Sequence, residues 1–235
     1  MQELITDRTI LVALTGSRAY GMEREDSDWD YRTITVPKTD EYLRIRNNPS
    51  VQVAKDETLD LVHYDLRRFV ELALKLNPTI LELLWRPPVY ANERGLALLK
   101  IRRHLHCVQI RNTYGGYGVA QIRKCRNALI GEKNSGIKAK NPYKHAAHCY
   151  RILQSGLEYL ESGELRVDRT NLDADYLKRI VAGDEDIYDV LDQAEQILKS
   201  YDKVKYSSIP ERSDIEAVNK IYLSLLDSFV GWSPL

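Results

Sequence analysis

The sequence has few cysteines, no long apolar run and no excess of charge of either sign. Its three cysteines, Cys107, Cys125 and Cys149, are too widely spaced for a Cys-x-x-Cys pair, which excludes a thiolate zinc site of that kind. They offer no disulfide framework either, so we expect free thiols in a reducing cytoplasm. No uninterrupted apolar stretch approaches the roughly 20 residues of a membrane-spanning helix, and we expect no membrane partner. The first ten residues lack the basic-then-apolar order of a secretory signal.

The net charge of zero hides a strongly basic segment. Twelve of the 34 Lys and Arg residues lie between Lys100 and Arg151, where Glu132 is the only acid. Such a segment within a neutral chain indicates that the basic part contacts an anion. The alternative is that basic helices pack against acidic neighbours from elsewhere in the chain.

The 235 residues suffice for one substantial domain or two small ones. The apolar run from Ile10 to Leu14, the β-rich segment 28–36 and the segment 57–64 predict three strands before residue 90. Beyond that point the pattern is helical. The expected helices are Glu93 to His106, Tyr117 to Leu129, Tyr143 to Leu160, Leu172 to Ala182, Ile187 to Ser200 and Ser213 to Ser228. The sequence therefore predicts an α+β fold, with a small mixed-sheet head in residues 1–90 and a helical domain in residues 91–235.

Local signals mark where several helices begin. Asp65 is placed as an N-cap for the amphipathic segment that follows it, and Pro78 after Asn77 favours the first turn of another helix. The glycines of the run TYGGYG are expected to precede a helix that begins near Tyr117.

Two carboxylates one residue apart, Asp28 and Asp30, open the second expected strand. Residues i and i+2 of a strand project from the same face, so both carboxylates would face one way while Trp29 faces the other. An oxygen-rich pair of this kind suits Mg²⁺ or Mn²⁺, and paired metal ions can support phosphoryl transfer. The alternative is a solvated face of an ordinary edge strand.

Gly16 and Ser17 follow the first strand, and a turn there can present backbone N–H groups and a hydroxyl to a phosphate. Asp60 lies between Leu59 and Leu61 in the third strand, where burial of an unpaired charge is costly. Beside Asp28 and Asp30 it would complete a set of three carboxylates and either bind metal or accept the proton of a hydroxyl. The alternative for Asp60 is an exposed position on an edge strand.

A second polar cluster lies in the segment KHAAHCYRIL. On a helix, Lys144, His148 and Arg151 share one stripe, which suits the phosphates of a nucleotide or of a nucleic acid. His145 lies on the shoulder of that stripe. The alternative is a solvated helix face with a structural histidine.

The motifs GSRAYG and DSDWD, followed by Asp60, resemble those of nucleotidyltransferases of the DNA polymerase beta superfamily. The segments YDLRRFVELALKLNPTILELLWRPPVY, GGYGVAQIRKC and KHAAHCYRILQSGLEYLESGEL resemble a bacterial and phage subgroup related to the polymerase-beta-type protein of RNA repair operons. The likeness extends to about residue 165. It implies a polymerase-beta-like nucleotidyltransferase head in residues 1–90, and a helical domain in residues 91–235 that completes the cleft for nucleotide and acceptor.

The resemblance implies that Asp28, Asp30 and Asp60 bind Mg²⁺ or Mn²⁺ and act in catalysis. It also implies that Gly16 and Ser17 bind a nucleoside triphosphate such as ATP. The adjacent Arg18 is assigned to the same ligand, as are Lys144, His148 and Arg151. The expected reaction moves a nucleoside monophosphate to a hydroxyl acceptor, for which the basic segment favours RNA, a tRNA or an RNA 3′ end. The alternatives are transfer to a protein or a small molecule, and a non-catalytic sensor of nucleotide or RNA.

Overall fold

The computed structural model describes residues 5–25, 27–37, 51–55, 59–135, 141–206 and 209–230. They form two compact units, of which unit 1 comprises residues 1–105 and 213–235 and unit 2 comprises His106–Arg212. The sequence suggested a division after residue 90. In the structure the first segment of unit 1 extends to residue 105, and the last helix, expected from Ser213 to Ser228, also belongs to unit 1. Helical periodicity identifies a buried face but carries no information on which unit covers it.

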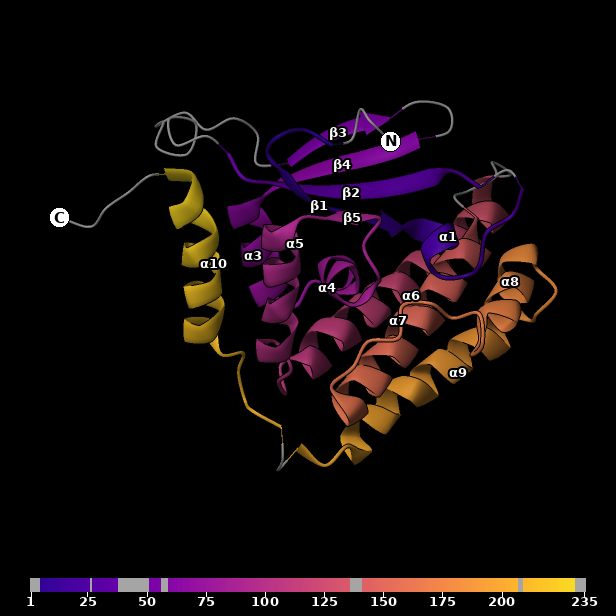
Figure 1. Cartoon of the computed structure of the whole chain (residues 1–235). Helices are drawn as coiled ribbons and strands as arrows, with labels where there is room; N and C mark the ends of the chain where they lie inside the picture. Colours follow the sequence, from indigo (N-terminus) through magenta and orange to yellow (C-terminus); the bar gives the residue numbers. More distant parts are fainter. Residues whose placement is uncertain are drawn as a thin grey trace. The chain divides into compact units, whose positions relative to one another are not determined.

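Among the residues that the structure describes, five strands form one mixed sheet in unit 1, in the order β3-β4-β2-β1-β5 (Figure 1). Strands β2 and β4 are parallel and the other pairs are antiparallel. The expected strands correspond to β1, β2 and β4, whereas β3 and β5 were missed because they are short and follow no clear alternation. Their bounds are β1 Thr9–Thr15, β2 Trp29–Thr35, β3 Val51–Lys55, β4 Leu59–Asp65 and β5 Tyr90–Ala91. The α+β class is thus confirmed.

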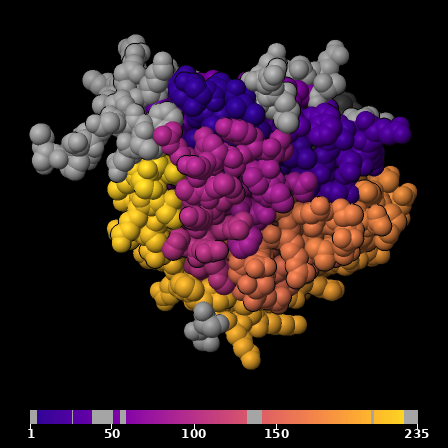
Figure 2. Space-filling view, viewed as in Figure 1, coloured from indigo at the N-terminus to yellow at the C-terminus, as the bar shows by residue number. Residues whose placement is uncertain are grey.

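Helices of unit 1 cover one face of this sheet (Figure 1). They are α1 (Gly16–Ala19), α3 (Leu66–Leu74), α4 (Pro78–Trp85), α5 (Glu93–Leu98), the 3₁₀ helix η2 (Leu99–His104) and α10 (Ile215–Val230). The expected cap at Asp65 is confirmed, since its carboxylate accepts from the Arg68 N–H at 2.6 Å. The next helix begins at Pro78 as expected, and there the Asn77 side chain accepts from the Ile80 N–H. In the space-filling view, α10 lies against the surface formed by α5 and η2 (Figure 2).

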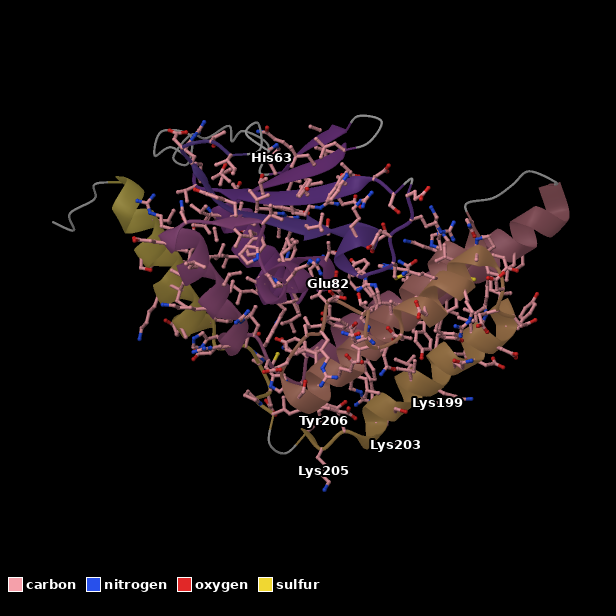
Figure 3. The ribbon with its side chains drawn as sticks, turned by 45° about the vertical axis from the view of Figure 1, so that its right-hand side comes forward. His63, Glu82, Lys199, Lys203, Lys205 and Tyr206 are labelled. Atoms are coloured by element: carbon pink, nitrogen blue, oxygen red, sulfur yellow. The ribbon has the colours of Figure 1, made fainter. Side chains whose placement is uncertain are left out.

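The alternation along β2 shows which residues face the helices. Ile34 and its β1 partner Leu11 have no exposed area, so they belong to the helix-covered face. Asp30, four residues before Ile34, projects from that same face. In the side-chain view, Glu82 of α4 lies on the helix side of the sheet and His63 of β4 on the other side (Figure 3).

Unit 2 is helical. It contains α6 (Ile110–Ser135), α7 (Pro142–Ser162), α8 (Ala174–Ala182), α9 (Ile187–Ser200) and the 3₁₀ helix η3 (Tyr201–Lys203). The predicted start of a helix near Tyr117 is wrong, because the TYGGYG glycines lie inside α6. A side chain at Gly118 would clash with α7, because a Cβ there would lie 2.4 Å from a methyl carbon of Leu153. The glycine run therefore allows two helices to pack closely.

Within the described ranges, no helix is both long and apolar enough to cross a membrane.

Candidate active site

The turn between β1 and α1 is built around Gly16. Its φ of +69° lies in the left-handed region, and a Cβ at this position would lie 1.9 Å from Oδ2 of Asp30. Glycine is therefore required both by the backbone conformation and by the close approach of the carboxylate. The Thr15 hydroxyl donates to the Asp30 carbonyl at 3.3 Å, which ties the end of β1 to the start of β2. The turn that carries Ser17 is thereby held against the Asp30 carboxylate.

Asp30 and Asp60 are direct partners in the parallel register of β2 and β4. Register partners on neighbouring strands share a face and are separated by roughly 5 Å between backbones. Asp28 is exposed and immediately precedes β2, two residues from Asp30. The structure thus brings Asp30, Asp60 and Gly16 together, with Asp28 at the open end of the strand.

Arg32 is a member of this group that the sequence argument missed. Its guanidinium lies 3.4 Å from Oδ1 of Asp60, and the same nitrogen donates to the carbonyls of Tyr31 and Asp60. The signal was present, because Arg32 is two residues beyond Asp30 and must share its face. A cation at this place reduces the repulsion between Asp30 and Asp60.

Arg18 has a defined place on the open end of β2. Its guanidinium donates to the Ser27 carbonyl through two nitrogens, at 3.2 and 2.8 Å. It also lies 4.1 Å from the ring centroid of Trp29. The side chain expected to contact a nucleotide is thus part of an arginine–tryptophan stack.

Hydrogen bonds connect the C-terminal end of α1 to α4 and its C-cap. The Tyr20 hydroxyl donates to Oε2 of Glu82 at 2.7 Å, and Glu82 is only 3% exposed. Arg86 donates to the Ala19 carbonyl. These contacts hold the end of α1, and with it the Gly16 turn, on the body of unit 1. Glu82 and Arg86 were not predicted as part of the site. Their signal was one charge inside the otherwise apolar α4 segment, Glu82, and a second charge at its C-cap, Arg86.

The predicted metal site requires carboxylate oxygens that lie together on one face. Across the side chains that the structure describes, no group of three or more His, Cys, Asp and Glu residues is gathered so that it could hold a metal ion. Asp30 and Asp60 nevertheless supply carboxylate oxygens on one face, which is the donor type that Mg²⁺ and Mn²⁺ prefer. The donor set fits such an ion, with Asp28 as the third expected ligand.

The second predicted cluster lies in unit 2. Lys144 is exposed, as expected, but Arg151 is only 3% exposed, so Lys144, His148 and Arg151 do not form one open stripe. Burial, with added repulsion from Arg151, His145 and Lys124, lowers the pKa of His148 to about 3. His148 is therefore neutral at physiological pH and adds no positive charge. His148 was expected on the cationic side of the helix, because spacing along one helix does not show what packs against it.

Other polar groups surround His148. His145 is hydrogen-bonded to Oε1 of Gln121 on α6 at 3.1 Å. Lys124 of α6 and Arg151 of α7 contribute positive charge near His148. Elsewhere in the basic segment, Arg126 pairs with Glu195 at 2.8 Å and Arg111 pairs with Asp202. The basic segment is thus partly neutralised by acids of α9 and η3, as its alternative interpretation expected.

The sequence matches the model of a known protein family. Residues 2–180 match the model of RlaP, described as the RNA repair pathway DNA polymerase beta family. The match covers more than half of the chain and includes the Gly16 turn, the three aspartates and the α7 cluster.

Two curated relatives are similar in sequence. Uncharacterized protein YcgL of Bacillus subtilis (strain 168) is 39% identical over 77 residues, which are 32% of this chain and 30% of that protein. An uncharacterized 38.9 kDa protein of Enterobacteria phage T4, from the nrdC-mobD intergenic region, is 25% identical over 179 residues, which are 71% of this chain and 51% of that protein. The aligned part of the chain thus spans about half of the phage protein and less of the bacterial one.

A solved structure is also similar. It is a nucleotidyltransferase-like protein from Exiguobacterium sibiricum, with 16% sequence identity and a TM-score of 0.34. The alignment covers 85% of this chain and 71% of that one.

Proposed function

The chain belongs to the RNA repair pathway DNA polymerase beta family, and on that premise we propose that it is a metal-dependent nucleotidyltransferase whose acceptor is a hydroxyl of RNA. One observation carries the proposal. Asp30 and Asp60 are register partners on one face of the sheet, and the Asp30 carboxylate lies against a turn that only glycine can form. A carboxylate pair beside a Gly-Ser turn is an arrangement that serves a metal ion and a phosphate together.

Each residue has a role in this proposal. Asp28, Asp30 and Asp60 hold Mg²⁺ or Mn²⁺, while Gly16 and Ser17 present backbone N–H groups and a hydroxyl to the triphosphate of ATP or another nucleotide. When bound, the ion supplies charge neutralisation for the triphosphate and for the leaving pyrophosphate. Arg32 limits the repulsion between the acids, and Tyr20 and Glu82 orient the turn. Positioning and electrostatics are sufficient for this class of reaction.

The proposed transfer conserves atoms and charge. The oxygen of the acceptor hydroxyl bonds to the α-phosphorus as the bond from that phosphorus to the bridging oxygen breaks. Pyrophosphate leaves with the electron pair of the broken bond, and the hydroxyl proton passes to a carboxylate, for which Asp60 is the candidate. The product carries one additional nucleoside monophosphate.

The cations of unit 2 support an anionic ligand. Lys124 and Lys144 are exposed and supply positive charge, the buried Arg151 adds to that charge from inside the unit, and His148 is neutral. Together with the family, they favour RNA as the acceptor over a protein or a small molecule.

The proposed acceptor is tested by finding which class of molecule receives a labelled nucleoside monophosphate. The protein is incubated with α-labelled nucleoside triphosphates, Mg²⁺ and total RNA, and the products are separated into RNA, protein and small molecules. We expect label in RNA and none after Asp28→Asn/Asp30→Asn, whereas Asp7→Asn, at an exposed position beside Arg8, retains full transfer. Label on a protein or small molecule would exclude the RNA acceptor. Stabilisation by a triphosphate without pyrophosphate release would identify a sensor.

A further inference from the structure

A row of flat side chains lies on the sheet face opposite the carboxylates. The rings of Trp29 and Tyr31, which are two residues apart on β2, are nearly parallel, with an interplanar angle of 4° and centroids 6.0 Å apart. The guanidinium of Arg18 lies 4.1 Å from the Trp29 centroid and continues the row. Planar groups in this order form a stacking surface.

The row is held at both ends. Tyr31 packs against the apolar cluster of Val12 and Leu61. At the other end, Arg18 is fixed by its two hydrogen bonds to the Ser27 carbonyl. Little side-chain entropy is therefore left to lose when a further planar group joins the row.

Trp29 is nevertheless open to solvent. Its side chain is 44% exposed. Trp29 is the first residue of β2, and its neighbours in the sequence are Asp28 and Asp30, two of the proposed catalytic aspartates. Exposure of a large aromatic side chain is unfavourable in itself, and together with a stationary guanidinium it matches what proteins present to unpaired bases.

We propose that Arg18, Trp29 and Tyr31 form a stacking platform for an unpaired nucleobase of the RNA acceptor. The inference rests on the proposed function, because it names how that site receives its acceptor strand. Trp29 and Asp30 are consecutive residues of an extended strand, so their side chains leave opposite faces. A mononucleotide whose phosphates lie beside Asp30 has its base only one ribose away, whereas a polynucleotide has the reach to place another base on the opposite face.

The platform makes no use of base edges, so it accepts any base. Stacking on aromatic rings and on guanidinium planes depends on the π-face that every base has. The guanidinium of Arg18 adds attraction for the adjacent phosphate. We therefore expect binding of single-stranded RNA of any sequence and weaker binding of a duplex, whose bases are already stacked.

The test measures RNA binding and nucleotide binding separately on the full chain. Fluorescence anisotropy with a short, labelled, unstructured RNA gives the Kd, and thermal stabilisation by ATP with Mg²⁺ reports on the nucleotide. Trp29→Ala should weaken RNA binding about 5- to 140-fold, which is the effect of losing one stacked base. It should leave stabilisation by ATP unchanged, and Trp29→Phe should restore most of the RNA affinity. Tyr188→Ala, at an aromatic residue of α9 that is 58% exposed, is the matched control.

An RNA with abasic nucleotides makes the test specific to stacking. Wild-type protein and Trp29→Ala should bind this RNA with equal Kd, because an abasic nucleotide has no base to stack on the Trp29 ring. The effect of Trp29→Ala on ordinary RNA should also persist at raised salt, since stacking is not screened. An equal loss on abasic RNA would overturn the platform, as would an unchanged Kd for Trp29→Ala on ordinary RNA. A loss of ATP stabilisation would assign the stack to the nucleotide instead.

Failure of the platform is distinguishable from failure of the proposed function. Asp28→Asn/Asp30→Asn should abolish label transfer and retain RNA binding, because it removes negative charge from the region. If that variant still transfers label, the proposed function is wrong whatever Trp29→Ala does. If transfer depends on the aspartates and RNA binding ignores Trp29, only the platform is wrong.

Discussion

At the scale of single residues, the site depends on how closely a carboxylate approaches the backbone. Gly16 has a positive φ, and the space of its missing Cβ is occupied by the Asp30 carboxylate. A change of one methyl group at Gly16 therefore acts directly on a group proposed to bind metal.

Gly16→Ala should reduce both stability and transfer. The left-handed backbone costs a residue with a Cβ roughly 1–2 kcal/mol, and the new methyl group must also displace Asp30. We expect a loss of about 1–3 kcal/mol in the free energy of unfolding and a decrease of at least about tenfold in transfer rate. Denaturant titration and the label assay measure the two effects.

Gly116→Ala is the control, because nothing lies within 4 Å of a Cβ at that helical position. Alanine there should keep full transfer and raise stability by up to about 1 kcal/mol. Full activity of Gly16→Ala would contradict the role given to the turn.

His148 gives the protein a predictable sensitivity to acid. Burial first, and then repulsion from Arg151, lowers its pKa from 6.5 to about 3. As the pH falls below 6.5, His148 is protonated in the unfolded chain but stays neutral in the folded chain, which favours unfolding. The free energy of unfolding is therefore unaffected by this residue above pH 6.5 and decreases as the pH falls from 6.5 toward 3. Between pH 7.5 and pH 5.5 this residue should cost about 1.4 kcal/mol of stability.

His148→Gln should remove that part of the pH dependence. Denaturant titrations at both pH values give the difference, and His104→Gln, at a part-exposed histidine of unit 1, shows the contribution of any other site. An identical loss between the two pH values in wild type and His148→Gln would show that His148 accepts a proton when folded.

At the scale of elements, much of unit 1 follows from local sequence. The apolar run from Ile10 to Leu14 predicted β1, and Asp65 and Pro78 predicted where α3 and α4 begin. The spacing of Asp28 and Asp30 predicted a shared face, but only pairing between β2 and β4 places Asp60 beside Asp30, and strand order is a non-local property. The contacts of α1 with α4 are equally non-local, which is why Glu82 and Arg86 were missed.

Tyr20→Phe should loosen the turn without touching the aspartates. The change removes a donor to Glu82, a carboxylate that is 3% exposed, and we expect a loss of about 1–3 kcal/mol in stability. The KM for the triphosphate should rise more than kcat falls, since the turn is oriented less well while the acids stay in place.

Tyr188→Phe removes a hydroxyl from an exposed tyrosine of α9 and should change neither stability nor KM. If Tyr20→Phe behaves in the same way, the link from α4 to α1 does not position the turn.

At the scale of the whole molecule, the two units differ in how the chain builds them. Unit 2 is one continuous segment, and the Val108 N–H donates to the Pro210 carbonyl near its two ends. Unit 1 is made from two segments, because α10 buries Val218 and Leu225. Helical periodicity predicted α10 as an element, but not its place.

We expect residues 106–212 to fold when produced alone, and a chain that ends at Arg212 to lose stability in unit 1. Loss of Val218 and Leu225 from the core should cost about 3–6 kcal/mol. Circular dichroism and denaturant titration of both products test this, and a fragment 106–212 without cooperative unfolding would contradict it.

The central claim is that Asp30 and Asp60, beside the Gly16 turn, form the metal and phosphate site of a nucleotidyltransferase. The most direct measurement is the rate of RNA-dependent pyrophosphate release with Mg²⁺, compared between wild type, Asp30→Asn, Asp60→Asn and Asp7→Asn. The claim predicts a decrease of roughly a hundredfold or more for each of the two site variants and none for Asp7→Asn. Release at the wild-type rate by folded Asp30→Asn or Asp60→Asn would contradict it.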